Sequence, residues 1–233
     1  MRLQVFLSNS GLCSRRKAFD LVQSGKVKVN DYIIKEPSYS IDQSRDIVEV
    51  DGQRVNLKEK TYIILNKPRG VTTTKKDPFA TKTVMDLLPD QYQHLFPVGR
   101  LDKETTGLLI LTNDGDLSHK LTHPSFEIDK VYIAKLDRPL NKDHKIKLQK
   151  GVLIEGEKTS PCKIVELNNK NIKIIIHEGK KRQIRKMLEI FKYKAISLER
   201  ISFGCLNIGN LAIGKWRQIS NGGLIKLKNI TER

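Results

Sequence analysis

The stretch that decides the fold is Gly99-Arg100-Leu101-Asp102-Lys103-Glu104-Thr105-Thr106-Gly107, followed by Leu108-Leu109-Ile110-Leu111-Thr112-Asn113-Asp114-Gly115. A Gly-Arg turn leads into a polar segment, and the fully apolar run after it has the length of a buried strand. Asp102 is therefore expected where a loop enters the core, close to the cation of Arg100. On spacing alone, an Asp before Thr and Glu is more often a turn or helix N-cap residue than a carboxylate held for chemistry.

The whole chain is strongly basic, with 43 Lys and Arg against 26 Asp and Glu and a formal net charge of +17 over 233 residues. This balance indicates an acidic partner, with nucleic acid ahead of a membrane surface. No apolar run reaches the length that spans a bilayer, so no membrane role is expected. Residues 1–58 carry ten Lys and Arg against seven Asp and Glu, so residues 59–233 hold +14 of the net charge.

Cysteine and histidine spacing gives no metal or disulfide signal. Cys13, Cys162 and Cys205 lie far apart, and His119 and His123 have no evident third ligand. Phosphate-binding loops and dinucleotide fingerprints are missing as well, so no general motif settles the reaction, and no metal site is expected. The N-terminus has no apolar signal-peptide segment, and we expect a cytoplasmic protein with reduced thiols.

Strand and helix patterns are mixed along the chain without regular alternation, which predicts an α+β fold. Apolar runs predict strands at 62–65, 108–112, 131–136 and 172–176, and apolar residues at helical spacing predict a helix over 180–191. The polar, basic residues 72–82 predict a loop. Asp51-Gly52 is a hairpin signal, and the polar residues after it predict a boundary between a domain over 1–58 and a second over 61–233.

Residues 1–58 predict two helices followed by strands. Ser14 is a suitable N-cap for a helix over 15–24, and 26–30 alternates like a half-buried strand. The cations of this region can bind phosphate or form a solvated surface, and spacing leaves both open; they are Arg15, Arg16, Lys17, Lys26 and Lys28. Residues 7–16, 25–30 and 46–52 resemble the alpha-L RNA-binding motif, a small module first known from a ribosomal protein. The resemblance implies RNA binding.

Three segments of the second domain hold candidate functional residues. Asp102 belongs to the first. Tyr132 lies in a predicted strand, where such a residue ordinarily packs in the core but can also stack on a base. Arg182 and Arg185 lie three residues apart at the start of a predicted helix, where they form either a basic outer face or a site for phosphate or a carboxylate.

In this order the segments resemble the RsuA/RluB/RluE/RluF family of ribosomal RNA pseudouridine synthases, over nearly the whole chain. The matching residues are 65–70, 99–115, 123–125, 130–132, 178–187, 198–204 and 211–217. The resemblance implies a catalytic domain with a mixed, mainly antiparallel sheet. It also implies conversion of a uridine of ribosomal RNA to pseudouridine without cofactor or metal. The wording of the motifs is closer to the branch that acts on large-subunit 23S RNA than to that acting on small-subunit 16S RNA.

The same resemblance implies individual roles. Asp102 matches the family's essential Asp, which acts on the sugar as nucleophile or base, and Arg185 matches the basic residue that pairs with it. Tyr132 matches the aromatic residue that packs on the target base. The remaining roles concern substrate binding: Arg100 in the gap left by an extruded base, Ile184 in the apolar wall, and Lys67, Arg69 and Arg182 on phosphates.

Ribosomal RNA or a ribosome-assembly intermediate is the expected partner, with no DNA and no membrane, and the chain is expected to be a monomer. Two alternatives stay open: a non-catalytic RNA-binding or ribosome-assembly protein, and a general nucleic-acid binder that also accepts DNA. Asp102, Tyr132 and Arg185 together favour the enzyme, because a protein that only binds RNA has no need of all three.

Overall fold

The computed structural model describes residues 1–232, and the chain divides into two compact units. The first unit holds Met1–Thr61 together with Asn113–Gly115, and the second holds Tyr62–Thr112 and the residues from Asp116 onward. Among residues 1–232, none of the helices has both the length and the apolar character needed to cross a membrane.

The first unit packs two short helices on a four-stranded antiparallel sheet. The helices are α1 (Leu3–Asn9) and α2 (Arg15–Gln23); the strands are β1 (Val27–Val29), β2 (Tyr32–Ile33), β3 (Val48–Val50) and β4 (Gln53–Arg54), in the order β2-β1-β3-β4. Ser14 caps α2 as predicted, because its side chain accepts from the Lys17 amide at 3.2 Å. Asp51 and Gly52 take the two positive φ angles, 49° and 76°, that a two-residue hairpin turn requires.

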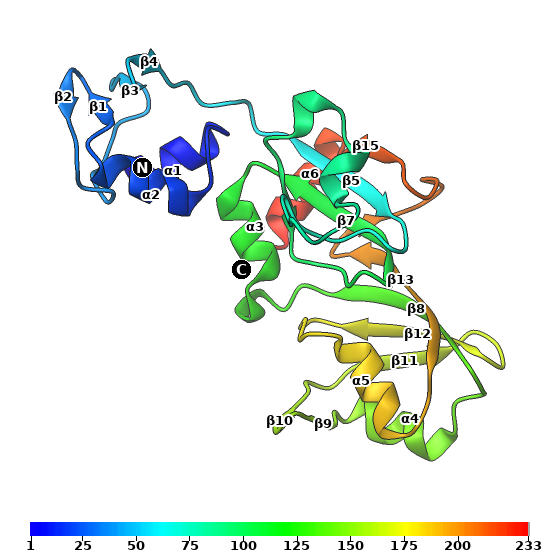
Figure 1. Cartoon of the computed structure of the whole chain (residues 1–233). Helices are drawn as coiled ribbons and strands as arrows, with labels where there is room; N and C mark the ends of the chain where they lie inside the picture. Colours follow the sequence, from blue (N-terminus) through cyan, green and yellow to red (C-terminus); the bar gives the residue numbers. More distant parts are fainter. Residues whose placement is uncertain (233) are drawn as a thin grey trace. The chain divides into compact units, whose positions relative to one another are not determined.

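The second unit is built on a nine-stranded sheet in the order β11-β12-β8-β13-β7-β5-β15, with β14 beside β13 and β6 beside β7 (Figure 1). Its strands are β5 (Tyr62–Lys67), β6 (Phe96–Val98), β7 (Thr106–Thr112), β8 (Lys130–Leu136), β11 (Lys163–Glu166), β12 (Asn171–Ile176), β13 (Ala195–Phe203), β14 (Leu206–Asn207) and β15 (Trp216–Gln218). Within the described residues, β13 and β7 alone pair in parallel. The predicted α+β fold with a mixed, mainly antiparallel sheet is confirmed.

Helices cover both faces of this sheet. They are α3 (Gly115–Thr122), α4 (Lys142–Gln149), α5 (Gln183–Ile190) and α6 (Asn221–Asn229), with 3-10 turns at Val84–Leu87, Asp90–Tyr92 and Pro124–Phe126 and a separate hairpin of β9 (Leu153–Ile154) and β10 (Glu157–Lys158). Alternate residues of β5 show the two faces, since Ile63 belongs to the core that includes α5, whereas Ile64 belongs to the core that includes α6. Figure 1 shows α5 beside β11 and β12.

The backbones of the parallel strands β7 and β13 approach each other unusually closely where Gly107 lies opposite Arg200. Gly107 has a φ of 104°, and a Cβ at this position would lie 2.3 Å from the carbonyl oxygen of Arg200. Only glycine fits this contact, which holds the centre of the sheet together next to the segment that carries Asp102. Arg200 is itself 2% exposed, with Nε donating to the Leu108 carbonyl at 2.8 Å and its guanidinium 5.0 Å from the centre of the Phe203 ring.

Candidate functional site

Asp102 lies in the loop 99–105, which joins β6 to β7. The loop is held from within, since Leu101 is 4% exposed and the Thr105 amide donates to the Asp102 carbonyl oxygen at 3.0 Å. Thr73 fixes it from outside, with Oγ1 donating to the Leu101 carbonyl at 2.7 Å. The half-buried Asp102 side chain is therefore carried on a rigid turn at the entrance to a core strand.

Lys67 holds the Asp102 loop in place through hydrogen bonds from the core side. Its side chain is fully buried, and Nζ donates to the carbonyl oxygens of Pro68, Asp102, Lys103 and Thr105 at distances of 2.9 to 3.3 Å. The prediction that Lys67 contacts phosphate is therefore wrong, because β5 extends through Lys67 and turns its side chain into the core. Burial lowers the pKa of the Lys67 amine to about 8, against the opposing influence of Asp102 and Glu104.

We expect Lys67→Met to lower the free energy of unfolding by about 1–3 kcal/mol at pH 7, because buried carbonyl groups lose their donor. The loss should grow with pH. An unfolded Lys keeps its proton up to about pH 10.4, whereas folded Lys67 releases it near pH 8. Between these values the unfolded state binds the extra proton, so Lys67 contributes a gain in stability as pH rises, and Lys67→Met loses this contribution.

Chemical denaturation at pH 7 and pH 10 tests this. The difference in unfolding free energy between wild type and Lys67→Met should widen by up to about 1.4 kcal/mol per pH unit above pH 8. Lys163→Met, at an exposed position of β11, is the matched control and should show no such widening. An equal difference at both pH values would contradict the depressed pKa of Lys67.

A cavity of about 340 Å³ opens beside the Asp102 loop. Its wall combines residues 99–102 and Thr105 with one residue each from β8, β12 and β13 and with residues 179–184 before and at the start of α5. Five of the predicted site residues line it together: Arg100, Asp102, Tyr132, Arg182 and Ile184. Its volume falls in the range of small-molecule sites, about 300–1,000 Å³.

Tyr132 supplies the aromatic part of the wall. It lies on β8 opposite Ile174 of β12 and Arg200 of β13, and it is 8% exposed. Ile184, from the first turn of α5, is 4% exposed and belongs to the same apolar cluster. The cavity thus places a flat ring and an aliphatic side chain on the same concave surface as a carboxylate.

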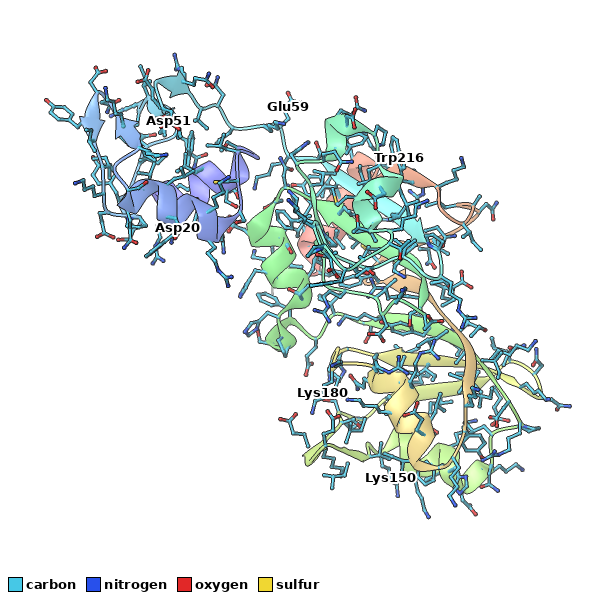
Figure 2. The ribbon with its side chains drawn as sticks, in the orientation of Figure 1. Asp20, Asp51, Glu59, Lys150, Lys180 and Trp216 are labelled. Atoms are coloured by element: carbon cyan, nitrogen blue, oxygen red, sulfur yellow. The ribbon has the colours of Figure 1, made fainter. Side chains whose placement is uncertain are left out.

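The predicted helix over 180–191 begins only at Gln183, because Arg182 takes a left-handed backbone with φ of 54°. Gln183 secures this turn: its side chain accepts from the Lys180 amide at 3.0 Å and donates to Glu178. Lys180, which is labelled in Figure 2, lies at the cavity rim. It pairs with Glu157 of β10 at 2.7 Å. Strained backbone held by such bonds concentrates at functional sites, and here it exposes the Arg182 side chain.

Arg185 reaches the back of the Asp102 loop. Its guanidinium donates to the carbonyl oxygens of Ala195 at 2.9 Å and of Glu104 at 3.3 Å, while its buried Nε has no hydrogen-bond partner among residues 1–232. Burial and Arg182 lower the pKa of Arg185, and Asp102 and Glu104 oppose this shift. Within residues 1–232, however, no ion pair of 4.0 Å or less joins Arg185 to Asp102. The pairing that the resemblance implied is present only as a longer-range attraction.

The other predicted contacts lie on the surface. Arg69 is exposed and pairs with Glu104 at 2.6 Å, and this hydrogen bond lowers the pKa of Glu104. The remaining cations are exposed residues of the first unit: Arg15, Arg16 and Lys17 in the first turn of α2, Lys26 just before β1, and Lys28 on the outward side of β1.

Thr105 was missed by sequence reasoning. It is 2% exposed, it lines the cavity, and its Oγ1 atom has no hydrogen-bond partner in the described structure. A buried hydroxyl without a partner is unusual in a folded protein and marks a position that a ligand can satisfy. The only sequence signal was its place three residues after Asp102.

Two family models match the chain: RNA pseudouridylate synthase over residues 61–190, and the S4 domain over residues 1–48. Ribosomal large subunit pseudouridine synthase B of Bacillus subtilis is 38% identical, covering 99% of this chain and 97% of the relative. The dual-specificity RNA pseudouridine synthase RluF of Escherichia coli is 33% identical, covering 100% of this chain and 80% of the relative. A crystal structure of a pseudouridylate synthase, 28% identical, aligns with a TM-score of 0.72 over 97% of this chain and 99% of that one.

Proposed function

We propose that this chain, which belongs to the RNA pseudouridylate synthase family, converts one uridine of ribosomal RNA to pseudouridine. Family members are isomerases, and the Bacillus subtilis relative, which is named for the ribosomal large subunit, supports ribosomal RNA as the substrate. The observation that carries the proposal is that Asp102, Tyr132 and Arg182 line the same cavity of about 340 Å³. We place the substrate uridine in 23S RNA, with 16S RNA as the second choice.

The isomerisation breaks the N1–C1′ bond, turns the uracil, and forms a C5–C1′ bond. The proton on C5 leaves and N1 gains one, so no atom is added or lost overall. Asp102 acts at the sugar, and both attack on C1′ and removal of a sugar proton need its ionised form. Arg185 and Lys67 both interact electrostatically with Asp102, so two cations lie near the carboxylate.

Tyr132 and Ile184 hold the uracil ring by apolar contact while it is free of the sugar. A uridine stacked in RNA must first be extruded, which costs a few kcal/mol, and the exposed guanidinium of Arg100 lies at the cavity to fill the gap. Arg182 and Arg69 are placed to bind neighbouring phosphates. The domain over 1–58 anchors the RNA, and the domain over 61–233 carries the reaction.

The substrate is tested by incubating purified protein with separate transcripts of 23S and 16S RNA and locating pseudouridine by carbodiimide modification and primer extension. We expect one modified uridine in 23S RNA. Modification of 16S RNA alone would reassign the substrate. Binding of RNA without any pseudouridine would favour the alternative function, a non-catalytic RNA-binding or assembly protein.

Charge in the first unit is expected to contribute through phosphate contacts. Replacing Arg15, Arg16 and Lys17 together by Gln should weaken RNA binding and reduce the slope of log Kd against log salt concentration by about 2, because each lost contact removes about 0.7. The matched control replaces Lys142, Lys147 and Lys150 of the second unit, all exposed, by Gln. An unchanged slope in the α2 variant would remove these residues from the RNA interface.

A further inference from the structure

Phe79 is the most exposed of the large apolar side chains in the described part of the chain, with 94% of its surface accessible. It lies in the loop 72–82, between β5 and the 3-10 turn Val84–Leu87. A single exposed ring is ordinary by itself. Three further features of this loop make Phe79 informative: an ordered tip, a fixed root and a shared cavity.

The tip of the loop is a built turn. The Phe79 amide donates to the Asp77 carboxylate at 2.9 Å, and the Ala80 amide donates to the Asp77 carbonyl oxygen at 3.2 Å. Pro78 restricts the backbone between them. These bonds form a turn of the kind that Asp and Pro stabilise, and the ring of Phe79 is exposed on this turn.

The root of the loop is fixed to the segment that carries Asp102. Thr73 Oγ1 donates to the Leu101 carbonyl oxygen at 2.7 Å and accepts from the Leu101 amide at 3.3 Å. The two ends of the loop also bond to each other, with the Thr72 amide donating to the Lys82 carbonyl oxygen at 3.0 Å. The position of Phe79 is thereby set relative to Asp102 within the second unit.

A cavity of about 580 Å³ lies between this loop and the Asp102 loop. Phe79 and Lys76 line one side, and residues 100–103 line the other. Arg100, Leu101 and Asp102 also line the cavity that contains Tyr132, so the two cavities share a wall. Lys76, Arg100 and Lys103 make the second cavity suitable for phosphate, and an exposed ring beside phosphate-binding cations suits a nucleotide.

We propose that Phe79 is a stacking platform for an unpaired base of the RNA next to the extruded uridine. The inference rests on the proposed function and names a contact that this function does not require. Base–aromatic stacking accounts for the exposed ring, and the Asp77 turn reduces the entropy lost when the base binds. The shared wall with Asp102 makes RNA the occupant rather than a protein partner.

The test compares Phe79→Ala, Phe79→Leu and Phe79→Trp for binding to a ribosomal RNA fragment that the wild-type protein modifies. We expect Phe79→Ala to raise Kd by about 5- to 100-fold, Phe79→Leu to recover little of this loss, and Phe79→Trp to bind at least as tightly as wild type. The salt slope should not change in Phe79→Ala. In the matched control, Lys76→Ala, it should fall by about 0.7, because a phosphate contact is lost.

A second measurement, of tryptophan fluorescence, tests whether the ring at position 79 stacks on an RNA base. The chain has one tryptophan, Trp216, so Phe79→Trp in a Trp216→Phe background gives a single reporter in the loop. RNA should quench its fluorescence if the ring stacks on a base. Unchanged Kd in Phe79→Ala, or RNA binding without quenching, would overturn the proposal even where the wild type forms pseudouridine. RNA that is bound and quenches the reporter, yet is never modified, would instead contradict the proposed function alone.

Discussion

Asp102→Asn is expected to abolish pseudouridine formation while leaving the affinity for RNA within about three-fold of wild type. Asn has nearly the shape of Asp but can neither attack a sugar carbon nor take up a proton. Replacing the single reacting group of an enzyme costs on the order of 10⁴-fold or more in rate. RNA affinity should persist because it comes from many phosphate contacts. The loop should also keep its conformation, because the bonds of the Asp102 backbone to Thr105 and Lys67 do not involve the carboxylate.

Single-turnover assays with excess enzyme separate the chemical step from binding for this variant. The matched control is Asp116→Asn, an exposed carboxylate in the first turn of α3, which should keep the wild-type rate. A rate for Asp102→Asn within ten-fold of wild type would remove Asp102 from the reaction. Loss of RNA binding together with loss of rate would show that the carboxylate is needed to form the complex.

Arg185→Ala is expected to lower the rate of the chemical step by about 100-fold or more, the effect of removing one fixed electrostatic contact from an enclosed site. Arg185 donates to the Glu104 carbonyl oxygen, within the Asp102 loop, and to that of Ala195 at the start of β13. Its removal takes away both a cation near Asp102 and a link between two walls of the cavity. Arg185→Lys keeps the charge without the planar fork, so it should recover part of the rate.

Arg138→Ala serves as the control for the structural part of this effect. Arg138 also donates to two backbone carbonyl oxygens, those of Phe191 and Lys192, but it makes no bond to the Asp102 loop, as Arg185 does through Glu104. Both alanine variants should lose some stability in thermal melts, whereas only Arg185→Ala should lose rate. Equal rates in the two variants would mean that Arg185 has only a structural role.

Patterned segments of the fold were predictable, and segments with charged residues in the core were not. The strands β5, β7, β8 and β12 followed from apolar runs. β13, the strand at the centre of the sheet, was not predicted, because Glu199 and Arg200 interrupt its apolar pattern. Arg200 is buried because Leu108 supplies an acceptor and Phe203 a ring, and both partners depend on the tertiary structure.

The candidate site shows the same division. Asp102, Tyr132 and Arg182 were named from the sequence and line one cavity. Lys67 was assigned to phosphate on the family resemblance, yet its amine bonds to the carbonyl oxygens of the Asp102 loop from inside the core. The partners of Arg185 and the unsatisfied hydroxyl of Thr105 depend on residues brought together by folding, so no local pattern indicated them.

Pseudouridine mapping across the ribosomal RNA of a strain that lacks this protein tests the central claim most directly. The strain is complemented in parallel with the wild-type chain and with Asp102→Asn at equal protein levels. We predict that one pseudouridine disappears in the deletion, returns with the wild type, and stays absent with Asp102→Asn. Restoration of that pseudouridine by Asp102→Asn, or an unchanged map in the deletion strain, would contradict the account.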